Sequence, residues 1–291
     1  MTLSVAVIGN CQVGSMARCV RALLPEAAVK PISLMSAVRE SRAEAMAKVA
    51  ERCDLIFTQE FETAGLGPLT TTALAAVRPD LIRYPRIVFT GFHPDINYIF
   101  DGPRAVTSPM GDYHSEILMG AFLSGLPLER ALRLFRPLTY QRLGYFKEYA
   151  RCLRRLVRDG EALGFDLAPL AETWRADGAF MHTINHPKIR VMASLARLAL
   201  ARAGLAVAEI DPDQIEDGLA AGPRWPVYPE IAERLEVAGG LDFVTANASG
   251  GEVIDLAAFA AGSYERYGEL SSEVLGARLR SATLEVIAGI A

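Results

Sequence analysis

Apolar runs and helical patterns alternate along the first third of the chain. The helical patterns cover about residues 12–24, 37–52 and 68–77. The segments around them are short apolar runs rich in β-branched residues, which are typical of strands buried on both faces. They predict strands at residues 3–8, 54–59 and 86–91, and the segment 29–34, VKPISL, is also predicted to be an extended strand. Strands that alternate with helices in this way predict a parallel sheet with helices on both faces.

After about residue 105 helical periodicity dominates and β-branched runs become rare. Helices are predicted at about 114–124, 128–136, 138–160, 168–177, 187–203, 212–220, 229–236, 255–267 and 271–289. We therefore predict an α/β fold, with an N-terminal parallel sheet of about four strands and flanking helices, followed by a largely α-helical C-terminal part. The predicted division is a Rossmann-like subdomain over 1–105 and a mainly helical subdomain over 106–291. No Ser/Gly-rich linker separates them, so we expect the helical part to pack on the sheet.

Composition narrows the class of protein. The 291 residues are 51% hydrophobic and 22% charged, which is typical of a soluble globular protein. The net charge is −4 without a basic block, which argues against nucleic-acid binding. Charged residues interrupt every apolar stretch before about 18 positions, so no membrane-spanning helix is expected. The N-terminus does not have the pattern of a secretion signal, and together these features predict a cytoplasmic protein, most often an enzyme.

The four cysteines form no C-x-x-C pair and are too few for a disulfide framework. Cys19 and Cys152 fall at apolar positions of helical patterns, and Cys53 precedes an apolar run. These three are predicted to be buried as small hydrophobic residues. Cys11 differs from them because of its position between a strand and a helix.

Cys11 lies in the segment Gly9–Ser15, which joins the first predicted strand to the first predicted helix. Ligands of parallel sheets bind beyond the carboxyl ends of the strands, and first-turn amides of a helix favour anions. The positive end of the helix dipole is expected to lower the pKa of a thiol placed there. We therefore predict that Cys11 is a nucleophile. The alternative is a small residue that fills a tight turn.

This segment is similar to two known phosphate-binding motifs but matches neither of them. Gly9 and Gly14 have the spacing of a P-loop, but Ser15 and Met16 follow where that motif has Lys and then Ser or Thr. The dinucleotide motif G-x-G-x-x-G is absent because Cys11 replaces its second glycine. The position also resembles that of the nucleophile in GDS-type esterases, with Gly-Asn-Cys in place of Gly-Asp-Ser. A thiol hydrolase is therefore an alternative function.

His93 directly follows the fourth predicted strand, so we expect it at the same sheet edge as Cys11. A thiol and an imidazole form the minimal set for nucleophilic catalysis by cysteine. Asp95 is a candidate for orienting the imidazole, although residues two positions apart often point in different directions. The alternative is that His93 is a turn histidine bonded to the backbone.

His114 falls at a predicted helix start, for which Asp112 is a candidate N-cap. His182 and His186 are four positions apart, but Pro187 disfavours helix at His186 and no acidic third ligand follows. We therefore predict no metal site.

Two later segments are candidate anion sites. Asn185 and Lys188 stand at the start of the next predicted helix, where a phosphate would be stabilised. The stretch from 222 to 230 is dense in proline and aromatic residues, so it is not regular helix. There Arg224 could bind an anion, and Trp225 or Tyr228 could stack on a base. The alternative for that stretch is a packed loop.

Several of these stretches together resemble the WcbI-type polysaccharide biosynthesis proteins of bacteria. The matching stretches, in order along about 230 residues, are AVIGNCQ at 6–12, FHPD at 92–95, DYHS at 112–115, FMHTINHPK at 180–188 and WPVYPE at 225–230. GNCQ alone is a weak motif, but GNCQ, HPD and INHPK in this order form a fairly specific set.

This resemblance implies a coenzyme-A-binding protein that is an acetyltransferase acting on a capsular or surface polysaccharide precursor. It implies that Cys11 and His93 form the catalytic pair, and Asn10, Gln12 and Asp95 are candidate oxyanion-stabilising or orienting residues. The candidate contacts of coenzyme A are Gly9, Gly14, Ser15, Arg18, His114, His182, Asn185, His186, Lys188, Arg190, Arg224 and Trp225.

Two further functions stay open beside an acyl-CoA-dependent acetyltransferase. One is the thiol hydrolase, and the other is a non-catalytic module that binds coenzyme A or a nucleotide within a biosynthetic assembly. The expected partners are an acyl donor and a sugar or polysaccharide precursor, with no nucleic acid and no metal, and a homo-oligomer stays open.

Overall fold

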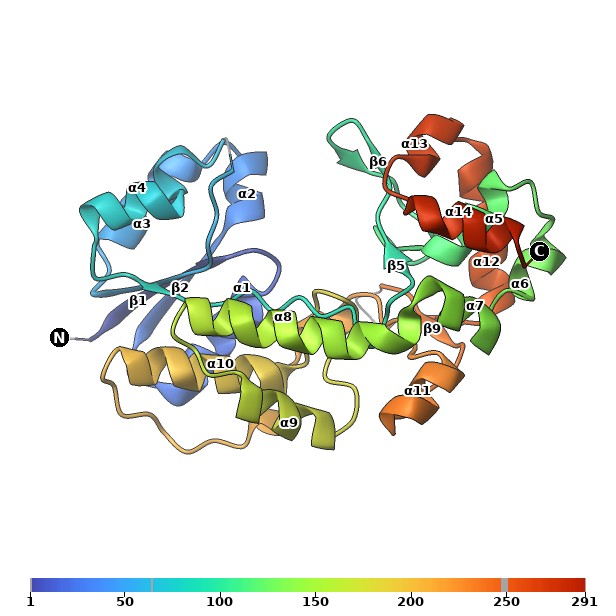
Figure 1. Ribbon diagram of the computed structural model, residues 1–291. Coiled ribbons are helices and arrows are strands. Elements are labelled where there is room, and N and C mark those ends of the chain that lie inside the picture. The colour runs from blue at the N-terminus through green and yellow to red at the C-terminus, as the bar shows by residue number, and fades with distance from the viewer. Residues whose placement is uncertain (1, 64, 247–250, 291) are drawn as a thin grey trace. The chain divides into compact units, whose positions relative to one another are not determined.

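The computed structural model describes residues 2–63, 65–246 and 251–290 (Figure 1). The chain forms two compact units, each assembled from separate stretches. The first unit contains residues 1–88, 155–180 and 186–219, and the second contains residues 89–154, 181–185 and 220–291. Because neither unit is one continuous stretch, the sequence division near residue 105 stays a prediction.

The first unit is built on a parallel four-stranded sheet in the order β2-β1-β3-β4. Its strands are β1 (Ser4–Gly9), β2 (Ala28–Ser33), β3 (Leu55–Thr58) and the short β4 (Ile82–Arg83). This sheet and the largely helical C-terminal half confirm the predicted fold class, and the first three strands lie within one residue of their predicted bounds.

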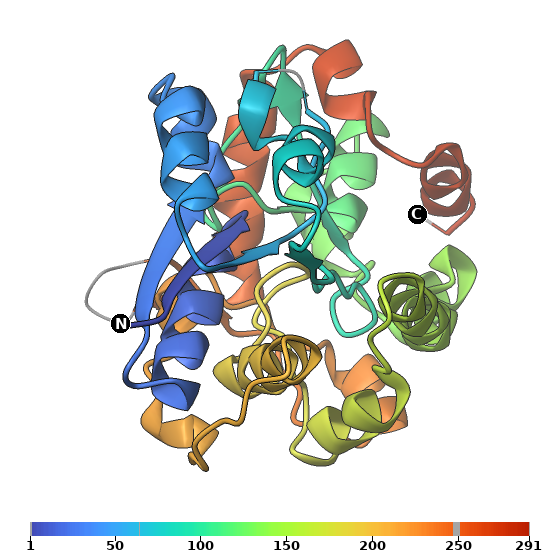
Figure 2. The same ribbon diagram turned by 90° about the vertical axis from the view of Figure 1, so that its left-hand side faces the viewer.

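Helices cover both faces of this sheet (Figures 1 and 2). On one side lie α2 (Leu34–Arg39), α3 (Ala43–Glu51), the 3-10 turn η1 (Gly67–Leu69) and α4 (Thr71–Val77). On the other side α1 (Val13–Leu23) packs against α10 (Ile189–Arg202), which joins α9 (Ala168–Ala176) from the later part of the chain. Residues far apart in the sequence therefore complete the first unit.

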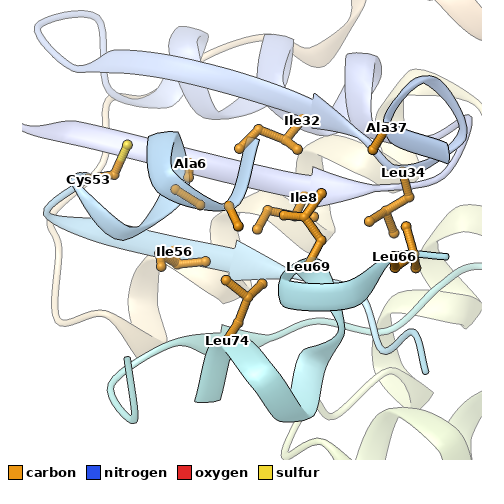
Figure 3. Packing of buried hydrophobic residues seen from close by; sticks show 12 residues of the cluster. Ala6, Ile8, Ile32, Leu34, Ala37, Cys53, Ile56, Leu66, Leu69 and Leu74 are labelled. Atoms are coloured by element: carbon orange, nitrogen blue, oxygen red, sulfur yellow. The ribbon is translucent and has the colours of Figure 1, made fainter. Parts of the chain in front are cut away.

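The core of the first unit lies between the sheet and α2, α3, η1 and α4 (Figure 3). Ala6, Ile8, Ile32 and Ile56 project from the strands, and the helices contribute apolar side chains that include Leu74. All of these side chains are buried, and Ala6, Ile8 and Leu74 are fully inaccessible to solvent. Removing such area from water is the main favourable term in folding.

The strand predicted at 86–91 is wrong. The fourth strand is β4, two residues long, and the chain from Tyr84 onward has no strand assignment until Ile96. The apolar pattern of this segment reflects burial, since Ile87 and Phe89 are inaccessible to solvent. Side-chain atoms of Gln12 instead hydrogen-bond both backbone polar groups of Ile87.

Three long predicted helices are broken in the structure. The segment 37–52 divides at Ser41, whose φ is 53°, and 138–160 divides at Gly144, whose φ is 79°. A positive φ ends a right-handed helix. The segment 271–289 divides into α13 (Ser272–Gly276) and α14 (Ser281–Ala288), and 212–220 forms only the 3-10 turns η3 (Pro212–Gln214) and η4 (Gly218–Ala221).

The second unit is mainly helical. Its buried α5 (Glu116–Leu123) packs against α12 (Leu256–Gly268), α13 and α14. The other helices are α6 (Leu128–Leu132), α7 (Pro137–Leu143), α11 (Pro229–Leu235) and the first part of α8 (Glu148–Ala162), with a 3-10 turn η2 (Tyr145–Lys147). Three antiparallel pairs complete it, β5 (Ile96–Asn97) with β8 (His114–Ser115), β6 (Phe100–Asp101) with β7 (Arg104–Ala105), and β9 (Phe243–Val244) with β10 (Val253–Ile254).

Three predictions from the cysteines are confirmed, because Cys19, Cys53 and Cys152 are buried and unbridged. Within residues 2–63, 65–246 and 251–290, no helix is both long and apolar enough to cross a membrane.

The core of the first unit predicts a large difference between two positions on α4. Leu74 is fully buried whereas Val77 is 58% exposed. Leu74→Ala should lower the free energy of unfolding by about 2–5 kcal/mol, because it removes buried methyl groups and leaves a cavity. Val77→Ala should change it by less than about 0.5 kcal/mol. Urea denaturation measures both, and equal effects would contradict the assigned packing.

Candidate active site

Cys11 is half-buried in the turn between β1 and α1, in the first unit. The Asn10 side-chain oxygen accepts a hydrogen bond from the Gln12 amide at 3.0 Å. The Asn10 carbonyl accepts from the Val13 amide at 3.1 Å. These two bonds around Asn10 close the turn and hold Cys11 at its corner, as an Asx turn does.

A set of side-chain hydrogen bonds, which we call the glutamine clasp, fixes this turn to the rest of the unit. The Gln12 side chain donates from Nε2 to the Ile87 carbonyl at 2.6 Å and accepts at Oε1 from the Ile87 amide at 3.2 Å. Gln59 donates from Nε2 to Gln12 Oε1 at 3.1 Å and accepts from the Asn10 amide at 3.0 Å. Gln12 and Gln59 are both inaccessible to solvent. The clasp therefore connects Cys11 to the end of β3 and to the segment after β4.

Gly9 permits this arrangement by its lack of a side chain. A Cβ atom at Gly9 would lie 2.8 Å from the Tyr84 hydroxyl and 2.9 Å from Gln59 Oε1, closer than real Cβ contacts. Tyr84 donates from that hydroxyl to the Ile8 carbonyl at 3.1 Å. Gly14, within the first turn of α1, has no such neighbour, since its nearest contact would be Arg18 at 3.7 Å.

The pKa of Cys11 is raised above its ordinary value by burial, so the predicted lowering is wrong. The backbone amides of Cys11 and Gln12 and the charge of Arg86 oppose the shift but do not outweigh burial. Gln12, not Cys11, occupies the N-cap of α1, so the thiol lies outside the first turn of the helix. A thiol with a raised pKa is protonated at neutral pH and needs a base to react.

Carboxylates of the first unit already contact the predicted anion-binding groups there. Arg18 pairs with Glu216 at 3.4 Å. At the start of α10, Asp217 accepts from the Ile189 amide at 3.1 Å, which is the position predicted for a phosphate.

The neighbouring basic residues are similarly occupied or buried. Arg190 pairs with Asp213 and, at 2.7 Å, with Asp177. Burial lowers the pKa of Lys188, while Asp217 and Asp177 act in the opposite direction. Ser15 is buried in α1, and His186 is half-buried just before α10.

His93 and Asp95 belong to the second unit. His93 is buried, its amide donates to the Thr90 carbonyl at 3.0 Å, and its ring lies 6.3 Å from that of Phe92. The sheet-edge argument for His93 is wrong, because the strand on which it depended does not exist. Its pairing with Cys11 stays a prediction.

Asp95 is the centre of a buried hydrogen-bond network in the second unit. Its carboxylate accepts from the hydroxyls of Tyr145 at 2.8 Å and Tyr228 at 2.7 Å, and from the Ile117 amide at 3.0 Å. Burial raises the pKa of Asp95 to about 6, although hydrogen bonds from Ser115, Tyr228, Ile117 and Tyr145 oppose the shift. Sequence reasoning missed both tyrosines as its partners, since they are 50 and 133 positions away.

His114 is buried in the second unit and its imidazole contacts protein groups. One ring nitrogen lies 2.9 Å from the Val106 carbonyl and the other 3.3 Å from the Tyr267 hydroxyl. Burial lowers the pKa of His114 to about 4, so the ring is neutral at pH 7. Ser115 rather than Asp112 caps α5, because its hydroxyl accepts from the Leu118 amide.

The remaining predicted contacts also lie in the second unit. Asn185 accepts from the Tyr113 hydroxyl at 2.5 Å, and the His182 carbonyl accepts from the Trp225 amide at 2.9 Å. Arg224 donates to the Ala220 carbonyl at 3.0 Å. Trp225 is 4% exposed and its ring packs edge-on against Phe243 and Phe259, which agrees with the packed-loop alternative. Among the described residues no three His, Cys, Asp or Glu side chains are grouped to hold a metal ion.

The fold and this turn define an α/β protein with a cysteine between the first strand and the first helix of a parallel sheet. Residues 4–208 match the family described as polysaccharide biosynthesis enzyme WcbI, and the chain belongs to that family.

A solved structure shares the fold over 99% of both chains, with a TM-score of 0.76 and 13% sequence identity. It is described as WcbI, a novel polysaccharide biosynthesis enzyme, in its native form without a disulfide bond between coenzyme A and one of its cysteines. The comparison with curated proteins finds no match.

The glutamine clasp predicts that the Gln12 side chain tolerates little change. Gln12→Glu keeps the acceptor for the Ile87 amide but removes the donor to the Ile87 carbonyl. It should lower the free energy of unfolding by about 1–3 kcal/mol, because a buried acceptor loses its partner. Gln214→Glu, at an exposed position of η3, is the matched control. Equal stability of the two variants in urea denaturation would exclude the clasp as a structural element.

The Asp95 network predicts a specific pH dependence of stability. Asp95 titrates near pH 6 when folded and near about 3.9 when unfolded. As pH rises, the unfolded chain therefore loses the Asp95 proton before the folded chain does. The protonated carboxyl stabilises the fold fully below about pH 4, and this stabilisation is lost by about pH 6, which lowers the free energy of unfolding by about 3 kcal/mol.

Asp95→Asn should remove this pH dependence. The free energy of unfolding of the wild type minus that of the variant should therefore fall as pH rises from 4 to 6. Denaturation at several pH values measures it, with the exposed Asp101→Asn as control. A difference that stays constant over this range would refute the assigned shift.

Proposed function

We propose that the protein transfers an acyl group from coenzyme A to a hydroxyl group of a polysaccharide precursor. The observation that carries the proposal is a half-exposed thiol on a rigidly held turn at the carboxyl edge of a parallel sheet. Ligands of such sheets bind at this edge. Membership of a polysaccharide biosynthesis family and the coenzyme A described for its structural relative also support it.

In the first step the Cys11 sulfur attacks the carbonyl carbon of the acyl thioester. His93 accepts the thiol proton, since the raised pKa of Cys11 leaves little thiolate at neutral pH. The new carbon–sulfur bond to Cys11 forms, the bond to the coenzyme A sulfur breaks, and the coenzyme leaves as a thiol with that proton. General-base help of this kind contributes about 10²–10⁴-fold.

In the second step a sugar hydroxyl attacks the acyl-Cys11 carbonyl and transfers its proton to His93. The acyl–oxygen bond forms, the bond to sulfur breaks, and the proton returns to Cys11. The backbone amides of Gln12 and Val13, which follow Cys11, already donate to Asn10. The proposed oxyanion donor is therefore the side-chain NH₂ group of Asn10, and one such donor typically contributes about 10²–10³-fold to the rate. The Gln12 side chain bonds Ile87 instead, so we assign it a positioning role.

The donor is a polyanion, and the groups of this chain that suit its phosphates are local. Arg18 and the first-turn amides of α1 follow directly after Cys11 in the sequence. Arg18 is partly exposed and its pair with Glu216 is also exposed, and such surface pairs contribute little. A phosphate can therefore replace that carboxylate at low cost.

An acyl-enzyme on Cys11 is the testable intermediate. Wild-type protein mixed with acetyl-CoA should gain one acetyl group by intact-mass spectrometry, and Cys11→Ser should not form a thioester adduct. Cys53→Ala, which removes a buried cysteine of the same unit, is the control and should keep the adduct. A thermal shift with coenzyme A should accompany it, since a ligand at 100 times its Kd stabilises by about 2.7 kcal/mol.

The outcomes separate the mechanisms. A missing adduct together with transfer activity retained by Cys11→Ser would exclude the covalent route and leave direct attack assisted by His93. The absence of any thermal shift with coenzyme A would exclude the acyltransferase itself.

A further inference from the structure

A second feature of the first unit lies beside the Cys11 turn. A cavity of about 340 Å³ opens just beyond the ends of β3 and β4. Its polar wall contains Glu60, Arg83, Arg86 and Asp159, and its apolar wall includes Leu163.

The cavity and the Cys11 turn share one hydrogen-bonded framework. Gln59, which precedes Glu60, bonds the Asn10 amide. Tyr84 lines the cavity and its hydroxyl bonds the Ile8 carbonyl. Arg86 precedes the Ile87 backbone that Gln12 holds, and its charge acts on Cys11. A ligand in this cavity would therefore be positioned relative to the thiol by the glutamine clasp.

The charges of the cavity indicate what it binds. Two guanidinium groups and two carboxylates line the cavity. Arg83 pairs with Glu60 at 2.8 Å, and Asp159 pairs at 2.9 Å with Arg158, which is outside the lining. The Arg86 guanidinium lies 5.8 Å from the centre of the Phe61 ring and forms no ion pair among the described residues. A polyanion in this cavity would meet the two carboxylates as well as the guanidinium groups. A neutral ligand with many hydroxyls can donate to the carboxylates and accept from Arg86.

The size and the apolar wall agree with a sugar ring. Small-molecule sites occupy about 300–1,000 Å³, so this cavity is at the lower end of that range. Pro85, Ala162 and Leu163 add apolar surface to the same lining. A pyranose likewise has an apolar C–H face and a polar rim of hydroxyls.

We propose that this cavity is the acceptor subsite and holds an uncharged sugar ring of the polysaccharide precursor, with Glu60 and Asp159 as acceptors and Arg86 as donor. The assignment to the acceptor rests on the proposed function. Arg86 and Asp159 then determine which sugar is accepted.

Direct binding tests this assignment without any turnover. The probes are the methyl glycosides of glucose, galactose and mannose, observed by saturation-transfer difference NMR with the full chain. At least one glycoside should receive saturation from wild-type protein, and Arg86→Ala and Asp159→Asn should weaken its binding by about tenfold. Arg52→Ala and Glu51→Gln remove matched charges at exposed positions outside the cavity and should bind as wild type does.

Three results would overturn the assignment. These are no saturation of any glycoside by wild-type protein, equal binding by the cavity variants and the controls, or loss of the coenzyme A thermal shift in Arg86→Ala with glycoside binding intact. Unchanged melting temperatures of the variants exclude unfolding as the cause. A wild-type protein that binds a glycoside through Arg86 but never binds coenzyme A would contradict the proposed transferase and leave the sugar subsite standing.

Discussion

The hydrogen bonds between the side-chain amide of Gln12 and the backbone of Ile87 are the constraint on which the first unit's candidate site depends. A single side chain provides both a donor and an acceptor, so it satisfies two backbone groups as a neighbouring strand would. The same amide joins Gln59, which holds the Asn10 amide. Because Gln12, Gln59 and Ile87 are inaccessible to solvent, the bonds among them are costly to lose, and the Cys11 turn has one defined geometry.

The second unit uses a buried carboxylate for a comparable purpose. Asp95 joins two tyrosines, far along the chain, to the first turn of α5. Tyr140 stacks between Tyr145 and Tyr228, with ring centroids 5.9 and 5.6 Å away. The aromatic rings add contact area, and the hydroxyls supply the hydrogen bonds that a buried carboxylate requires. In both units a buried polar side chain connects segments that are distant in the sequence.

How much of the structure could be predicted from the sequence depends on how far apart the interacting residues are along the chain. The strands β1 and β3 were predictable because continuous apolar runs indicate burial within a sheet. The segment at Ile87 has the same pattern, but a side chain replaces its strand partner, and no local pattern reveals that. Cys11 was identifiable from its position between strand and helix. Gln59, Tyr84, Tyr145 and Tyr228 were not found as partners, because their roles arise from contacts over 49 to 133 positions.

The pairing of α1 with α10 has a consequence for synthesis of the chain. The buried face of α1, which includes Met16, Cys19 and Val20, is covered by a helix that begins more than 150 residues later. During synthesis, this apolar face of α1 is exposed on the nascent chain until α10 has emerged from the ribosome. Contacts of such long sequence separation slow folding and leave aggregation-prone surface uncovered meanwhile. The nascent first unit is therefore a natural client for chaperones that shield apolar surface.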